Sequence, residues 1–233
     1  MSSSSGLHPF RRIAVGGALV TSLAFGFGNA SLALAQDSTP AASPAAEATP
    51  TVVEPVQVTL TLIGVDNNVV GVARLTQEAP GAEVLITVAN AEDSGLTPGE
   101  HGLHIHEAGV CDPKTDPPFD SAGGHFNPEN GVHGSPDDPN SHAGDLGNLT
   151  VKEDGSFLLQ STSTRISLYP GDKNSLADAD GSSLMIHDHA DDLHTDPSGD
   201  SGGRIACGVI FQPEPGAVQS ATPVASPEAT PVG

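Results

Sequence analysis

The sequence has few of the basic and aromatic residues that nucleic-acid-binding proteins use. It contains no tryptophan, one tyrosine and seven phenylalanines, and 8 lysines and arginines stand against 29 aspartates and glutamates. The formal net charge of −21 argues against partners that need a basic surface, such as nucleic acids and anionic membranes. We therefore expect no nucleic-acid partner.

The N-terminus has the layout of a secretory signal peptide. Arg11 and Arg12 precede an apolar run, and small residues stand at Ala33 and Ala35. We predict that residues 1–35 are removed during export, by the general or the twin-arginine route. A retained membrane anchor is the alternative, although the run is short and rich in glycine for a stable span. We expect no membrane span in the mature chain, and a location in the extracellular space, the periplasm or the cell envelope.

Segments rich in proline, alanine and threonine flank the remaining sequence. Residues 36–55 and 213–233 offer almost nothing to bury, and such segments cannot offset the entropy lost on ordering. We predict a flexible linker and a disordered tail, which leave residues 56–212 as the folded domain. Association with a cell surface through these ends is a hypothesis, although drift in composition alone would explain their similarity.

Short segments of alternating polarity indicate β-strands. Residues 56–64, 69–76 and 82–90 alternate apolar and polar side chains, and turn signals such as DNN and EAPG separate them. Further candidate strands follow at 101–107, 145–152, 156–163, 183–189 and 204–211. Eight short strands without a convincing amphipathic helix predict an all-β domain, either a β-sandwich or a flattened barrel.

Two long segments do not have a strand pattern. Residues 108–145 and 190–203 are crowded with glycine, proline, aspartate and histidine. Long loops inside a compact domain are usually functional, so we expect the chemistry of the protein to lie there.

Histidines are concentrated around these loops. Nine of the ten lie between His101 and His194. On a strand, His104 and His106 project to one side and His101 to the other, so the first two can bind one metal ion. A pair of surface histidines is the alternative for such an isolated motif.

The first long loop favours the metal site. It adds three imidazoles and a carboxylate, from His125, His133, His142 and Asp145. Such a set matches a tetrahedral zinc site, and neutral imidazole also suits Cu(II). A solvated acidic loop would be rich in aspartate and glycine, but it has no reason to collect histidines.

Several motifs together resemble the copper/zinc superoxide dismutase family. They appear as HGLHIHEAGVC, GGHFNP, the loop 133–145, GDLGNL, MIHDHADDL and GGRIACGVI, and the resemblance spans 56–211. It implies an eight-stranded antiparallel Greek-key β-sandwich or flattened barrel with two long metal-site loops, of the exported bacterial type. The implied activity is superoxide dismutase, which converts superoxide to dioxygen and hydrogen peroxide by copper redox cycling beside a structural zinc.

The resemblance also implies the metal ligands. Copper would be bound by His104, His106, His125 and His187. Zinc would be bound by His125, His133, His142 and Asp145. The residues alone leave His187 and His189 as alternatives on one strand face, and the resemblance selects His187. Asp191 would hydrogen-bond one ligand imidazole of each metal, and His101 would be structural.

An arginine and two cysteines complete the implied site. Arg204 is the only lysine or arginine from Asn174 to the C-terminus, so it could simply neutralise nearby carboxylates. The resemblance implies instead that its guanidinium orients the anionic substrate, with His125 as the other catalytic residue. Cys111 and Cys207 are the only cysteines, and an exported protein retains disulfides. The resemblance implies that these two form one, although two free thiols are the alternative.

One feature departs from the family. The segment 187–204, which contains the second long loop, lacks the lysines that line the approach to the metal in the family and carries instead Asp188, His189, His194, Asp196 and Asp200. We expect this negative charge to repel superoxide at long range. The rival hypotheses are a non-catalytic copper/zinc-binding or storage module of the same fold, and a surface adhesion or spacer protein. A homodimer is left open.

Overall fold

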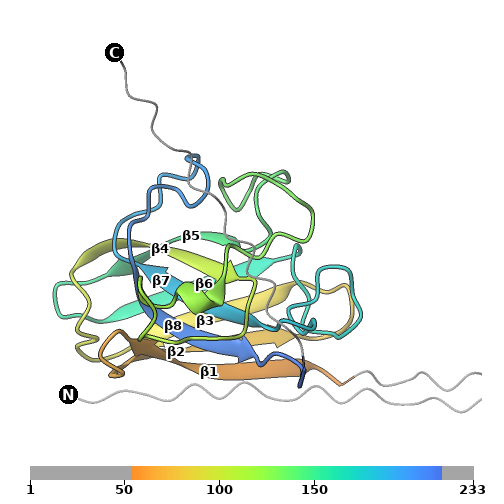
Figure 1. Ribbon diagram of the computed structural model, residues 1–233, viewed down its shortest axis with the longest axis horizontal. Helices are drawn as coiled ribbons and strands as arrows, with labels where there is room; N and C mark the ends of the chain where they lie inside the picture. Colours follow the sequence, from red (N-terminus) through yellow and green to blue (C-terminus); the bar gives the residue numbers. More distant parts are fainter. Residues whose placement is uncertain (1–53, 217–233) are drawn as a thin grey trace, which may run out of the picture. The chain divides into compact units, whose positions relative to one another are not determined.

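The computed structural model describes residues 54–216, so the predicted signal peptide and most of the predicted linker and tail lie outside the described residues. Eight strands and one short 3-10 helix make up this part of the chain (Figure 1). The strands are β1 (Val56–Gly64), β2 (Val69–Gln77), β3 (Val84–Asn90), β4 (Gly99–His106), β5 (Asp145–Val151), β6 (Phe157–Ser163), β7 (Ser182–His187) and β8 (Arg204–Phe211). The helix is η1 (Asp120–Ala122).

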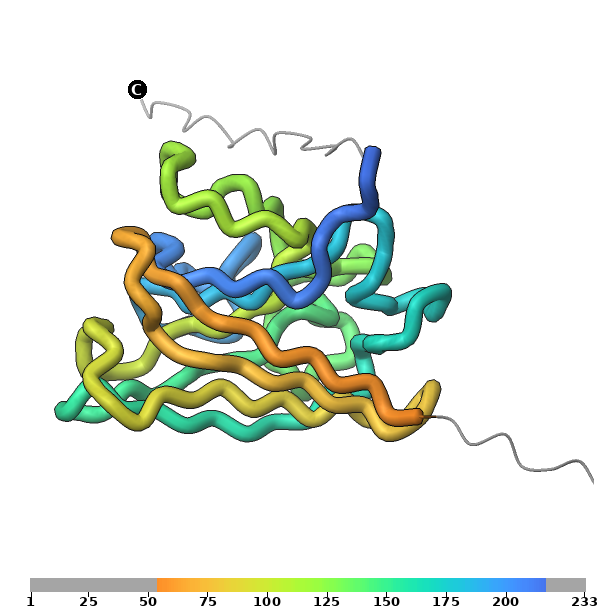
Figure 2. Tube along the Cα trace, turned by 90° about the horizontal axis from the view of Figure 1, so that it is seen from below, coloured from red at the N-terminus to blue at the C-terminus, as the bar shows by residue number. Residues whose placement is uncertain are grey.

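The strands form one closed antiparallel barrel in the order β1-β2-β3-β6-β5-β4-β7-β8. Pairing of Ile63 with Cys207 joins β1 to β8 and closes it. Figure 2 shows β1, β2, β3 and β6 running side by side along one wall. The connections β3–β4 and β6–β7 join strands that are not neighbours, as in a Greek key. The prediction of an all-β, eight-stranded fold is confirmed.

Alternation along the strands fills the barrel with apolar side chains. In β1, Leu60 and Leu62 are buried while Thr59 and Thr61 are exposed. The same period of two recurs in β2 and β3, which explains why these strands were visible in the sequence. Among the described residues, no helix is long and apolar enough to cross a membrane.

The two long loops follow β4 and β7, which are neighbours in the barrel. Leu103 of β4 pairs with Ile186 of β7, and both side chains belong to the core. Figure 1 shows parts of both loops above the barrel, in green and in blue. Both of the chain segments that follow β4 and β7 contact β4. The backbone N–H of Gly102 in β4 donates to the carbonyl of His189, and His106 forms an isolated β-bridge with His125. The outer face of β4 and β7 is therefore covered by loops.

Candidate metal centre

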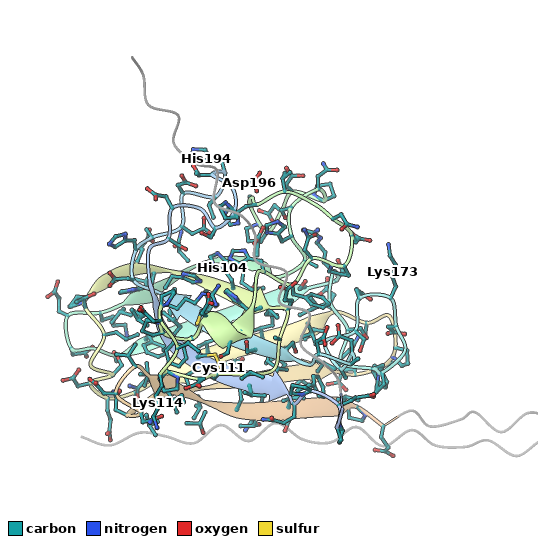
Figure 3. All side chains as sticks on the ribbon, in the orientation of Figure 1. His104, Cys111, Lys114, Lys173, His194 and Asp196 are labelled. Atoms are coloured by element: carbon teal, nitrogen blue, oxygen red, sulfur yellow. A yellow bond between two sulfur atoms is a disulfide. The ribbon has the colours of Figure 1, made fainter. Side chains whose placement is uncertain are left out.

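Four histidines gather on this covered face. His104 and His106 alternate with core residues along β4, so their imidazoles point away from the core. His187 ends β7, and His125 comes from the first loop. All four are buried, none more than 8% exposed. Figure 3 shows His104 beneath the loop that carries His194.

One nitrogen on each of these rings is buried without a hydrogen-bond partner in the described part of the chain. The four atoms are His104 Nδ1, His106 Nε2, His125 Nε2 and His187 Nε2. The four residues also bring one ligand atom each within 4.8 Å of one another. A buried polar atom without a partner costs about 1–3 kcal/mol, so four together indicate a ligand that the chain does not supply. A copper ion, which prefers imidazole nitrogen, fits this donor set.

A second cluster surrounds the carboxylate of Asp145. Its Oδ1 lies 2.8 Å from His125 Nδ1, 3.2 Å from His133 Nδ1 and 3.4 Å from His142 Nδ1. Ligands bound to a tetrahedral zinc ion lie about 3.3 Å apart, because each is about 2.0–2.1 Å from the metal. Oδ2 of the same carboxylate accepts hydrogen bonds from the backbone of Gly134 and His142, both at 3.0 Å. The carboxylate is thus held with one oxygen toward the imidazoles, as a zinc ligand would be.

His142 is the one predicted zinc ligand that is missing from the group of ligand atoms lying within 4.8 Å of one another. A set whose ligand atoms all lie within 4.8 Å contains His104 in its place, with His125, His133 and Asp145. However, His104 Nε2 is already engaged with Asp191 at 2.8 Å. His142 Nδ1 lies 3.4 Å from both His125 Nδ1 and Asp145 Oδ1. We therefore favour His142 as the fourth zinc ligand.

His125 belongs to both clusters through opposite edges of its ring. Its Nδ1 faces Asp145, and its Nε2 is one of the four unpartnered nitrogens. The ring centroid lies 4.0 Å from that of His104 and 5.3 Å from that of His142. This imidazole can therefore contact two ions at once.

The carboxylate of Asp191 hydrogen-bonds to one imidazole of each cluster. Its Oδ2 accepts a hydrogen bond from His104 Nε2 at 2.8 Å, and its Oδ1 accepts one from His133 Nε2 at 2.9 Å. Its backbone is fixed by Asn148 of β5, which donates to the Asp191 carbonyl at 2.9 Å and accepts from its N–H at 2.7 Å. Such partners orient ligand imidazoles and fix which nitrogen carries the proton.

Burial sets the protonation of the copper-side histidines. It lowers the pKa of His104, lowers that of His125 to about 3, and holds the pKa values of His106 and His187 well below their usual range. Neighbouring imidazoles and the positive charge of Arg204 lower the pKa of His106 and His187 further. At neutral pH these rings are uncharged, which is the form that binds metal.

His133 has the opposite protonation. Burial lowers its pKa, but hydrogen bonds to Asp145 and Asp191 outweigh that cost and raise the pKa of His133 to about 9. Burial also opposes ionisation of the two carboxyls, yet their imidazole partners hold both pKa values well below the usual range. Binding of zinc must therefore displace a proton from His133 in the metal-free protein.

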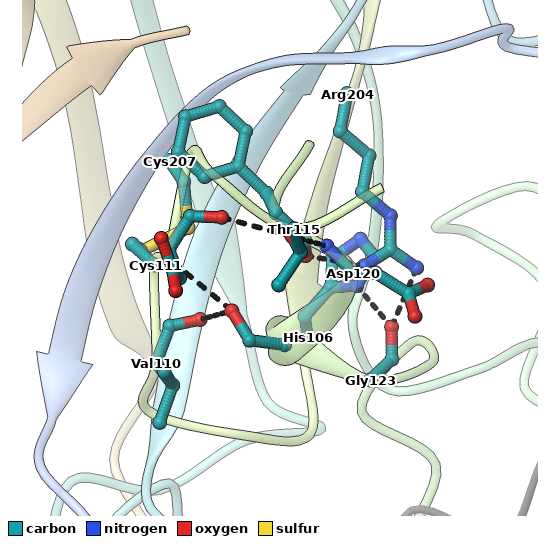
Figure 4. The surroundings of a disulfide bond; sticks show 11 residues. His106, Val110, Cys111, Thr115, Asp120, Gly123, Arg204 and Cys207 are labelled. Carbon is teal, nitrogen blue, oxygen red and sulfur yellow. Dashed lines mark hydrogen bonds between the residues drawn. A yellow bond between two sulfur atoms is a disulfide. The ribbon is translucent and has the colours of Figure 1, made fainter. Parts of the chain in front are cut away.

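Arg204 begins β8 beside the copper-side histidines. It pairs with His187 across the β7–β8 ladder. Its Nη1 donates to the carbonyl of Phe119 and its Nη2 to the carbonyl of Gly123, both at 2.7 Å (Figure 4). The Gly123 carbonyl also accepts from His106 Nδ1 at 3.0 Å. The arginine and a candidate copper ligand therefore share one backbone oxygen, which fixes their relative position.

Acidic residues flank this arginine. Burial lowers the pKa of Arg204, while the negative charges of Asp120 and Glu107 raise it. Both carboxylates are exposed, and Glu107 Oε1 accepts from the backbone of Gly124 at 2.9 Å. A guanidinium remains charged under these conditions, so the local field combines one fixed positive group with two nearby negative ones.

The disulfide anchors the loop that holds Arg204. Cys111 and Cys207 are bonded, with a Cα–Cα distance of 5.6 Å, so the predicted pairing is confirmed. Cys207 is wholly buried, and it packs with Phe119 and Met185 in a small cluster separate from the barrel core. The bond ties the start of the loop to β8, three residues from Arg204 (Figure 4).

The other three histidines among residues 54–216 lie outside both clusters. His101 bonds through both ring nitrogens, to the carbonyls of His187 at 2.7 Å and Thr97 at 2.8 Å. The expectation that His187 and His189 share a strand face is wrong, because β7 ends at His187. Beyond it, the backbone N–H groups of Asp188 and His189 donate to the carbonyls of Gly203 and Ser201, which precede β8. The side chains of His189 and His194 are 69% and 76% exposed, respectively. Neither competes for the buried metal positions.

Sequence reasoning missed the backbone acceptors of the site. The backbone carbonyls of Phe119 and Gly123 accept hydrogen bonds from Arg204. Every residue has such a carbonyl, so the sequence does not show which ones act as acceptors. The one available signal was the Gly123–Gly124 pair, because Gly123 has φ 74°, a conformation that side chains disfavour.

The chain is similar to proteins of a known family. A family model described as copper/zinc superoxide dismutase (SODC) matches residues 69–210. "Superoxide dismutase [Cu-Zn] 2" of Aquifex aeolicus is 43% identical over 150 residues, which cover 64% of this chain and 83% of that protein. "Superoxide dismutase-like protein YojM" of Bacillus subtilis is 46% identical over 119 residues, 51% of this chain and 59% of that one.

A solved structure shows the same fold. The crystal structure of a superoxide dismutase-like protein from Bacillus subtilis aligns with a TM-score of 0.57 at 39% identity, covering 65% of this chain and 97% of that one. The chain belongs to the copper/zinc superoxide dismutase family, whose cofactors are copper and zinc.

Proposed function

We propose that the protein is a superoxide dismutase that uses one copper and one zinc ion. The position of His125 is the main support, because its Nε2 faces the unpartnered nitrogens and its Nδ1 faces Asp145. The relatives in Aquifex aeolicus carry this activity in their names. Copper would be held by His104, His106, His125 and His187. Zinc would be held by His125, His133, His142 and Asp145.

The reaction consumes two superoxide ions and two protons. One superoxide loses an electron and becomes dioxygen, and the other gains that electron and leaves as hydrogen peroxide. Bound copper would supply the one-electron redox chemistry and bound zinc a fixed positive charge beside it.

The chain itself positions the substrate and the proton. The guanidinium of Arg204 lies at the copper-side cluster, held by two carbonyls, and binds the anion there. When it is not bound to copper, His125 Nε2 would be free to hold a proton for the product, since this nitrogen has no partner within the described part of the protein. Asp145 on the far side of the same ring keeps its orientation while the proton moves.

Charge on the protein opposes capture of superoxide. The formal net charge is −21, and the segment that follows β7 exposes Asp188, Asp192, Asp196 and Asp200. Arg204 and the bound ions attract the anion locally. We expect the rate constant to rise with added salt as the repulsion is screened. A rate that falls with salt would show that the local attraction dominates.

A non-catalytic metal-binding module is the second candidate. The relative in Bacillus subtilis is named only superoxide dismutase-like, so the fold alone does not carry the activity. A storage module has no need of a shared imidazole or of an arginine beside copper. Both His125 and Arg204 are present here, and His125 belongs to the copper-side cluster while Arg204 donates to the Gly123 carbonyl beside it, which supports the enzyme.

Superoxide removal by metal-loaded protein tests the two candidates. We expect about one copper and one zinc per chain and catalytic removal of superoxide. Arg204→Gln should remove superoxide more slowly while its metal content stays unchanged, and Arg74→Gln, on the exposed side of β2, should match the wild type. Protein that binds both metals and removes no superoxide would favour the storage module.

We also propose that the mature domain works outside the cytoplasm. The Cys111–Cys207 disulfide supports this location, because such bonds persist where the surroundings are oxidising. Sequencing the N-terminus of protein recovered from the producing cells would test it, with a start after Ala35 expected.

A further inference from the structure

Arg165 follows β6 and lies far in sequence from every predicted ligand. It is half-buried, and its guanidinium reaches across to the loop that carries the candidate zinc ligands. Its Nη1 donates to the Ser141 hydroxyl at 2.6 Å, to the Asp138 carbonyl at 3.1 Å and to the His142 carbonyl at 3.2 Å. Its Nη2 donates to the Ser141 carbonyl. One side chain thus supplies donors to three residues of one loop.

We propose that Arg165 is a positioning residue for the zinc site, which acts by fixing the backbone of Ser141 and His142. This inference rests on the proposed zinc site and adds a residue that touches no metal. Its function is to keep the His142 imidazole aimed at the carboxylate of Asp145.

The loop has little other support at this point. From Pro136 to Asn140 every residue is exposed. The loop makes an isolated bridge between Val132 and Ser141 in place of a strand ladder. Among residues 54–216, Arg165 is the only arginine or lysine whose side chain hydrogen-bonds to residues 132–142. Without it, the direction of His142 would depend on its contacts with Asp145 and on exposed loop residues.

His142 is held at the two ends of its own backbone. Its N–H donates to Asp145 Oδ2 at 3.0 Å, and its carbonyl accepts from both Arg165 and the Asp145 N–H, the latter at 3.2 Å. Fixing both peptide groups fixes the direction of the Cα–Cβ bond. The ring nitrogen is thereby placed 3.4 Å from Asp145 Oδ1, close to the spacing of tetrahedral ligands.

Electrostatics alone would predict the opposite effect on zinc. A positive guanidinium near a cation site weakens binding through repulsion, so its removal should strengthen zinc binding if charge were all that mattered. The hydrogen bonds predict weaker binding instead, because partners that orient ligands typically contribute 10- to 100-fold in metal affinity. The direction in which zinc affinity changes therefore distinguishes charge repulsion from positioning by hydrogen bonds.

The test compares zinc dissociation constants of the full-length protein by competition with a chelator. We expect Arg165→Gln to raise the zinc dissociation constant about 10- to 100-fold. Arg165→Lys keeps the charge but lacks the guanidinium fork that reaches the carbonyls of Asp138, Ser141 and His142, so we expect it to weaken zinc binding as well. Arg74→Gln removes the same charge at a distant exposed position and should bind zinc like the wild type.

A spectroscopic measurement excludes a general loss of stability. Cobalt(II) bound in place of zinc reports the ligand geometry through its visible absorption bands. We expect altered bands in both Arg165 variants, while hydrogen exchange of the barrel strands matches that of the wild type.

Two outcomes would overturn the inference in distinguishable ways. Wild-type affinity and unchanged cobalt bands in both Arg165 variants would remove the role of Arg165 and leave the proposed function intact. A wild-type protein that binds no zinc would overturn the zinc assignment itself, and this inference with it.

Discussion

Replacing Asp191 by asparagine should weaken at least one of the two metal sites. The carboxylate accepts from His104 Nε2 at 2.8 Å and from His133 Nε2 at 2.9 Å, and all three side chains are fully buried. Asparagine has nearly the same shape but only one carbonyl oxygen. One of the two imidazoles therefore keeps an acceptor, and the other faces an amide donor that cannot accept its proton.

The expected loss follows from those contacts. An imidazole that loses its orienting partner typically loses 10- to 100-fold in metal affinity, or about 1.4–2.7 kcal/mol. Whichever imidazole loses its acceptor shows this loss, so at least one of copper and zinc should bind 10- to 100-fold more weakly to Asp191→Asn.

Titration against chelators of known affinity measures both constants. Asp188→Asn removes an exposed carboxylate three positions away and is the matched control, which should bind both metals like the wild type. If Asp191→Asn binds copper and zinc as tightly as this control, the link between the two clusters has no energetic role and the reasoning fails.

Three further predictions concern the disulfide, pH and charge. Replacing Cys111 and Cys207 by serine should lower the free energy of unfolding by up to about 4–5 kcal/mol, since the bond closes a separation of 96 residues; an unchanged denaturant midpoint would contradict this. Metal-free protein should be most stable near pH 6.5. Below pH 6.5, the unfolded chain binds a proton that folded His125 does not bind, because burial lowers its pKa to about 3, so stability falls as pH falls. Above pH 6.5, folded His133 keeps a proton that the unfolded chain has lost, so stability falls with rising pH until the pH passes the pKa of His133 at about 9. Each such proton changes the free energy of unfolding by about 1.4 kcal/mol per pH unit, and a flat profile in thermal unfolding would exclude this account. Asp120→Asn should speed superoxide removal at low salt, because it removes a negative charge beside the substrate-binding guanidinium; an equal or slower rate in pulse radiolysis would argue against the proposed field.

The strands could be predicted because their signal is local. Alternation along β1, β2 and β3 depends only on which side chains face the core, and it is written in consecutive residues. The order in which strands pair is not local, since the neighbours of β6 and β7 are set by packing across the barrel. The closed barrel therefore needed the structure, or the family resemblance, to be defined.

The candidate site was predictable in part for the same reason. Clustered histidines and the alternation of His104 with His106 were visible, because few other roles concentrate imidazoles in this way. The choice of His187 over His189 was not, because it depends on where β7 ends. Hydrogen bonds from Arg165 to backbone carbonyls leave no pattern in the sequence, so only coordinates reveal them.

Diffraction from metal-loaded protein at the copper and zinc absorption edges tests the central claim most directly. The account predicts two separate anomalous peaks, with copper against His125 Nε2 and zinc against His125 Nδ1. A single peak, or two peaks of which the His125 ring touches only one, would contradict the shared imidazole and the proposed catalytic centre.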